Sequence, residues 1–201
     1  MIGTAVMSRT AEIKRESKET KISVSLSLDG TGEAAVTSGI PFFDHLLESA
    51  CRHGYFDLQL KCEGDTDIDA HHSIEDCGIV LGRAFREASC VPGIKRFGSA
   101  VIPMDEALVR AAVDICGRPH LTYAVGLQDL CIDRLNGLVF REFFRGFVND
   151  AGITLHISLL EGDEPHHCLE ATFKSFGIAM DKALQSEPRC KGTPSSKGML
   201  D

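Results

Sequence analysis

Alternating apolar and polar positions predict strands along the whole chain. In Lys21–Leu28 the apolar residues fall at every second position, which is the period of a strand with one buried face. Gly30 and Gly32 then mark a turn. The same pattern predicts further strands at 33–37, 55–62, near 106–115, near 120–126 and at 153–160.

Apolar residues spaced three and four positions apart predict helices between these strands, at 41–52, 72–88, 136–149 and 167–185. The order strand, strand, helix, strand, helix occurs twice. It predicts an α+β two-layer sandwich that arose by internal duplication, with two similar half-domains that each hold a mainly antiparallel sheet and two helices. We expect the half-domains at 1–92 and 93–186, followed by a C-terminal tail at 187–201.

A histidine-rich motif also occurs twice, at Asp69–Asp76 and again at Glu164–Ala171. In the first copy, His71 and Glu75 stand four residues apart at a predicted helix start, so their side chains share one face and can reach one ion. His72 lies about 100° around the helix axis and points elsewhere. The pattern therefore predicts a bridge between two metal ions, in which one pair binds one metal and the middle histidine reaches toward another.

Paired histidines near a helix start can also be plain surface residues, but the surroundings repeat as well. Each copy follows a glycine, an alternating strand and a Glu-Gly-Asp turn. Further upstream, His45 and Glu142 fall at matching places on matching helices, and both are residue types that bind metals. If the halves pack helix to helix, both motifs should come toward a common edge.

Composition limits the class of protein. The chain has 201 residues, 43% of them hydrophobic, and no run long enough to span a bilayer, so we expect no membrane partner. The net charge of −8 argues against nucleic acid as a partner. The eight cysteines form no Cys-x-x-Cys pair, and residues 1–15 show no secretory signal. These features indicate reduced thiols and a cytoplasmic location, or a plastid location if a transit peptide has been removed.

Several segments resemble, in order, the signature segments of imidazoleglycerol-phosphate dehydratases: Gly39–His45, Asp69–Asp76, Met104–Leu108, Gly117–Pro119, Thr154–Ile157, His166–Lys174 and Pro194–Gly198. The resemblance implies a ribosomal protein S5 domain 2-like fold. It also implies a histidine-biosynthesis hydro-lyase that converts imidazole glycerol phosphate to imidazole acetol phosphate. Two Mn²⁺ ions per active site and a hollow homo-oligomer of 24 subunits with shared active sites are further implications.

The reaction is consistent with these residue types. Divalent ions on both ring nitrogens would turn the substrate's imidazole into an imidazolate that expels hydroxide. A carboxylate would then remove a proton from the carbon beside the resulting diazafulvene. Imidazole and carboxylate ligands suit Mn²⁺, although such sites also take Fe²⁺, Co²⁺ or Zn²⁺.

The resemblance assigns roles to individual residues. Glu142 departs from the family pattern, because a histidine usually stands there. Glu19, which also contacts substrate, is the favoured proton-transfer residue and His53 is the second acid–base candidate. The implied metal ligands are His45, His71, His72, Glu75, Glu142, His166, His167 and Glu170; the implied phosphate-binding residues are Arg96, Arg118, Lys174, Ser196 and Lys197.

Some of these residues also have non-functional interpretations. Glu19 could be a solvated residue at a strand start, and the polar tail could be plainly disordered. Asp76 and Asp105-Glu106 are expected to cap helices or orient ligands, and His120 and His156 to be structural. Two rival functions stay open: a metallohydrolase that releases phosphate from an ester, and a non-catalytic metal-binding assembly.

Overall fold

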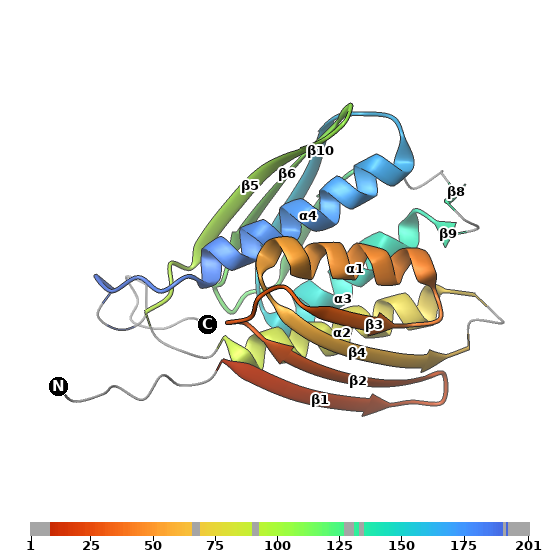
Figure 1. The fold of residues 1–201 in the computed structure, drawn as a ribbon, viewed down its shortest axis with the longest axis horizontal. Helices are drawn as coiled ribbons and strands as arrows, with labels where there is room; N and C mark the ends of the chain where they lie inside the picture. Colours follow the sequence, from red (N-terminus) through yellow and green to blue (C-terminus); the bar gives the residue numbers. More distant parts are fainter. Residues whose placement is uncertain are drawn as a thin grey trace.

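The part of the chain that the structure describes folds into two four-stranded sheets with four helices between them (Figure 1). The computed structural model describes residues 9–65, 69–89, 93–126, 131–132, 135–190 and 192. Within this part of the chain no helix is long and apolar enough to cross a membrane. The two sheets lie on the outside and the helices fill the space between them, so the apolar core lies where the helices meet one another and the inner faces of the sheets.

The first half contributes β1 (Thr10–Glu16), β2 (Thr20–Ser27), β3 (Ala34–Thr37), α1 (Pro41–Gly54), β4 (Asp57–Gly64) and α2 (His71–Ala88). Its sheet has the strand order β1-β2-β4-β3. The first three strands in that order pair antiparallel, whereas β3 pairs parallel with β4. This parallel pair is possible because α1 crosses over between the two strands.

The second half repeats this plan with β5 (Phe97–Met104), β6 (Ala107–Asp114), β7 (His120–Ala124), α3 (Leu138–Ala151), β10 (Thr154–Glu161) and α4 (Pro165–Leu184). The strand order β5-β6-β10-β7 matches the first sheet, and β7 again pairs parallel with β10. A two-stranded insertion, β8 (Cys131–Ile132) and β9 (Leu135–Asn136), separates β7 from α3. The duplicated α+β architecture expected from the sequence is therefore confirmed.

Helices of one half pack against helices of the other, α1 on α4 and α2 on α3. Both crossings depend on glycine. A Cβ at Gly177 would lie 2.1 Å from the Ala50 carbonyl oxygen, and one at Gly82 would lie 2.4 Å from that of Phe147. These two contacts occupy equivalent places in the two halves. The duplication has thus kept the same close helix approach on both sides of the core.

All predicted strands and helices are present, and each boundary differs from its prediction by two residues or fewer. The edge strands β1 and β5 and the short strands β8 and β9 were not predicted. The apolar residues of β1 are only Ala11 and Ile13, and β5 contains Gly98 and Pro103, so neither sequence shows a clean alternation of apolar and polar residues. Helices α1 to α4 start on the same side of the molecule, at the right of Figure 1, so both histidine motifs lie on that side.

Candidate functional site

The first cluster of possible metal ligands joins α1 to α4. Nε2 of His45 lies 3.5 Å from Oε2 of Glu170, and Nε2 of His166 lies 3.4 Å from the same oxygen. Ligand atoms of these three residues all lie within 4.8 Å of one another. The α1–α4 crossing brings them together, because His45 sits in the second turn of α1 and the other two sit in the first turns of α4. Two imidazoles and one carboxylate are a donor set that fits a divalent transition metal.

Lys174 keeps Glu170 ionised. Its Nζ lies 2.8 Å from Oε1 of Glu170, one helical turn away. Burial by itself raises the pKa of Glu170, but hydrogen bonds from Lys174 and His45 outweigh it, and the pKa lies below its usual range. One carboxylate oxygen is thus neutralised by the lysine, while the other faces the two imidazoles.

The second cluster occupies the equivalent place between α2 and α3. Nε2 of His71 lies 3.2 Å from Oε2 of Glu75, so the i, i+4 geometry predicted from the sequence is present. Glu142 faces them from α3, with a side chain that is only 13% exposed. Arg145 contacts both carboxylates: its Nη2 lies 3.1 Å from Oε1 of Glu75 and is also in close contact with Glu142. Arg145 was not predicted as part of the site, because its link to Glu75 depends on how two helices cross.

The middle histidine of each motif points away from its neighbour. The rings of His71 and His72 stand at 88°, and those of His166 and His167 at 86°. Nδ1 of His72 lies 3.0 Å from Asp65, and this contact raises the pKa of His72. Such a carboxylate fixes the ring orientation and directs Nε2 outward, as second partners of metal-binding histidines do.

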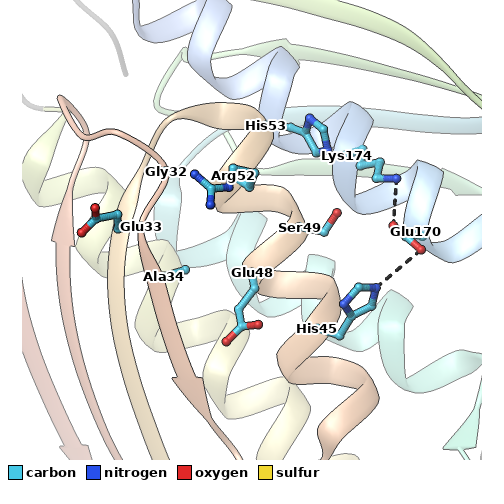
Figure 2. Close-up of a pocket in the computed structure, with 10 residues that line it drawn as sticks. All are labelled: Gly32, Glu33, Ala34, His45, Glu48, Ser49, Arg52, His53, Glu170 and Lys174. Carbon is cyan, nitrogen blue, oxygen red and sulfur yellow. Dashed lines mark ion pairs between the residues drawn. The ribbon is translucent and has the colours of Figure 1, made fainter.

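A cavity of about 470 Å³ adjoins the first cluster (Figure 2). His45, His53, Glu170 and Lys174 line it, and Figure 2 shows Lys174 and His45 flanking the Glu170 carboxylate. Partial burial and the positive charge of Lys174 lower the pKa of His53, so its neutral form is favoured. A second cavity, of about 920 Å³, adjoins the other cluster and is lined in part by His71 and Glu142.

Glu19 lies at the tip between β1 and β2, on the same side as the helix starts. It is exposed, and its negative charge helps to raise the pKa of His72. Its carboxylate has no hydrogen bond or ion pair with any residue that the structure describes. An acidic group that is near the first motif and has no internal hydrogen bond among the described residues is available to a bound ligand.

Arg96 and Arg118 lie far from both clusters in the same chain. The backbone N–H of Arg96 donates to Ala183 in the last turn of α4, and its guanidinium pairs with Asp114. Between His166 and Ala183 the helix extends about 25 Å, at roughly 1.5 Å per residue. Arg118 lies before β7, where its backbone oxygen accepts a hydrogen bond from Thr154 at the start of β10. Ser196 and Lys197, the other expected phosphate contacts, lie outside the described residues.

For two further acidic residues, the sequence indicated the position but not the histidine that each contacts. The turn after β4 was recognised, but not that its Asp65 would bind His72. Glu106 was expected to cap a helix or orient a ligand, and it lies 2.8 Å from Nδ1 of His167. The strand positions could have indicated both contacts, because each residue follows a strand that runs toward the helix starts.

Comparison with known proteins places these observations in a family. A family model described as imidazoleglycerol-phosphate dehydratase matches residues 38–180. The imidazoleglycerol-phosphate dehydratase of Pelobacter propionicus is 50% identical over 195 residues, which cover 96% of this chain and 100% of the relative. That of Geobacter metallireducens is 49% identical with the same coverage.

Solved structures agree with the sequence relatives. The imidazoleglycerol-phosphate dehydratase of Pyrococcus furiosus superimposes with a TM-score of 0.80 at 33% identity, covering 94% of this chain and 100% of the other. That of Staphylococcus aureus gives a TM-score of 0.79 at 33% identity, covering 88% and 99%. The chain therefore belongs to the imidazoleglycerol-phosphate dehydratase family.

Proposed function

We propose that this chain is an imidazoleglycerol-phosphate dehydratase of histidine biosynthesis, which removes water from imidazole glycerol phosphate to give imidazole acetol phosphate. The observation that supports it most directly is the pair of equivalent His–Glu clusters at the starts of two helix pairs, each with a middle histidine held by a carboxylate. Family membership identifies the reaction class.

The residues that would hold metal are those of the two clusters together with the middle histidines: His45, His71, His72, Glu75, Glu142, His166, His167 and Glu170. We propose two Mn²⁺ ions per active site. When bound, these ions would supply Lewis-acid polarisation of the substrate's imidazole and fix the ring in place. Asp65 and Glu106 contribute by holding the middle histidine rings in a single orientation.

Glu19 is the proposed proton-transfer residue. Its carboxylate has no partner among the described residues, so it can accept the proton from the carbinol carbon without first breaking an internal contact. His53 is the second candidate. Its lowered pKa favours the neutral imidazole at neutral pH, the form that accepts a proton, and it lines the same cavity as Lys174.

The positions of the proposed phosphate-binding residues in one chain support a site shared between subunits. Lys174 lies beside the first cluster, whereas Arg96 and Arg118 lie at the far ends of α4 and β10. A substrate with a three-carbon chain cannot reach from one end of α4 to the other. If Arg96 and Arg118 bind its phosphate, together with Ser196 and Lys197, a neighbouring subunit must bring them. This is the arrangement expected in a 24-subunit homo-oligomer.

One assay tests the proposal and its rivals. The purified protein is incubated with Mn²⁺ and imidazole glycerol phosphate, and the product is followed by the ultraviolet absorbance of its enol in alkali and by a free-phosphate assay. Appearance of the enol without free phosphate supports dehydration. Free phosphate instead would indicate a metallohydrolase. Metal binding with neither product would indicate a non-catalytic metal-binding assembly.

A further inference from the structure

Asp76 links α2, the helix that carries His71 and Glu75, to the β1–β2 tip. It follows Glu75 on α2, but its side chain turns toward the sheet and is nearly buried. Its Oδ2 accepts a hydrogen bond of 2.5 Å from Oγ1 of Thr20 and also contacts the guanidinium of Arg15. These two residues lie on either side of the turn, so a single carboxylate holds both strands of the tip against α2.

The tip itself is closed by Ser17. Its Oγ accepts hydrogen bonds from the backbone N–H groups of Glu19 (3.2 Å) and Thr20 (3.0 Å), and its own N–H donates to the Thr20 carbonyl oxygen at 2.8 Å. The tip is therefore a compact turn closed by its own hydrogen bonds. Arg15 and Thr20, which flank the turn, both bond to α2 through Asp76, whereas the Glu19 side chain anchors nothing among the described residues.

The second half secures its corresponding tip in a different way. There the tip residue Glu106 binds Nδ1 of His167 directly, and Ala171 stands at the position equivalent to Asp76. In the first half Asp65 contacts the middle histidine, His72, and Asp76 accepts the hydrogen bond from Thr20 at the tip. Glu19 occupies a tip equivalent to that of Glu106. Unlike Glu106, its side chain holds no histidine among the described residues.

We propose that Asp76 is a positioning residue that acts through Glu19: it fixes the β1–β2 tip on α2 so that the Glu19 carboxylate is held in place for proton transfer. The inference rests on the proposed function. Because a catalytic group displaced by about 1 Å can lose on the order of 100-fold in rate, a buried anchor one residue beyond a metal-ligand candidate is a sensitive place for this task.

The test uses Asp76→Asn, which removes the charge at nearly constant volume, and Thr20→Val, which removes only the hydroxyl donor. We expect kcat to fall on the order of 10- to 100-fold in Asp76→Asn and less in Thr20→Val, with KM and bound Mn²⁺ little changed. Thr20→Ser keeps the donor and should restore turnover. Asp29→Asn is the matched control, since Asp29 pairs with Arg9 at the opposite end of the same two strands.

A double variant separates positioning from general support. If Asp76 acts through Glu19, adding Asp76→Asn to Glu19→Gln should lower kcat no further than Glu19→Gln alone. Amide hydrogen exchange at residues 16–20 should rise in Asp76→Asn and stay unchanged in Asp29→Asn. Additive losses, or exchange that does not change in Asp76→Asn, would overturn the inference. Absence of dehydration by the wild-type protein would instead be a failure of the proposed function, because the exchange measurement does not depend on activity.

Discussion

Oε2 of Glu106 lies 2.8 Å from Nδ1 of His167, so the tip between β5 and β6 holds a histidine at the start of α4. This contact raises the pKa of His167 and lowers that of Glu106. In the first half the equivalent histidine, His72, is held by Asp65 from the end of β4. The duplicated halves thus reach the same ring orientation with carboxylates from different segments.

We predict that Glu106→Ala weakens Mn²⁺ binding by about 10- to 100-fold, the usual effect of removing a residue that orients a metal-binding histidine. Free Mn²⁺ measured by electron paramagnetic resonance during a titration gives the affinity. The control is Glu161→Ala, which removes an exposed carboxylate on β10. Equal affinities for the two variants would show that His167 is not a ligand or needs no support.

Arg145→Gln should strengthen Mn²⁺ binding roughly two- to fivefold. The half-exposed guanidinium contacts Glu75 and Glu142 and so competes with a cation for the same carboxylates. The same titration measures the effect. Arg83→Gln is the matched control, because Arg83 also joins α2 to α3 through an ion pair, with Asp150, away from the clusters. Weaker binding in Arg145→Gln would mean that the arginine supports the ligands.

Glu142→Gln and Glu142→His test whether the departure from the family's usual histidine keeps a ligand. Loss of the charge should weaken Mn²⁺ binding by at least about tenfold, whereas the imidazole should retain much of it, since both a carboxylate and an imidazole bind this metal. Bound Mn²⁺ per subunit and activity are measured together. If neither substitution alters them, Glu142 is not a ligand.

Metal and assembly should be coupled. If neighbouring subunits complete each other's sites, stripping divalent ions should reduce the particle to smaller oligomers, and added Mn²⁺ should restore it. Light scattering before chelation, after chelation and after Mn²⁺ addition measures the mass. An unchanged mass after thorough chelation would show that assembly does not depend on bound metal.

Truncation after Arg189 should leave metal binding and assembly intact while reducing turnover severely and weakening substrate binding, because the removed tail carries Ser196 and Lys197. Lys197→Ala should produce part of the same effect by removing one charge-assisted phosphate contact, about 1.5–3 kcal/mol. Steady-state kinetics gives kcat and KM for both variants. A truncated enzyme with normal kcat and KM would make the tail dispensable.

The sequence by itself determined the positions of the helices and of six strands, the duplication and the pairing of each first histidine with its glutamate. These features follow from periods within one strand or helix, and Glu75 lies one turn from His71 whatever the helix packs against. Matching places on matching helices also indicated Glu142 and His45 as partners of the two motifs. The edge strands β1 and β5 escaped because their alternation is weak.

Only the tertiary structure decided which side chains meet across elements. The α1–α4 crossing puts His45 beside Glu170, and the α2–α3 crossing puts Arg145 between Glu75 and Glu142. Such contacts depend on helix angles set by close packing of the whole core, which no local period encodes. The distance of Arg96 from the first cluster likewise follows from the length of α4, and the proposal of a site shared between subunits depends on it.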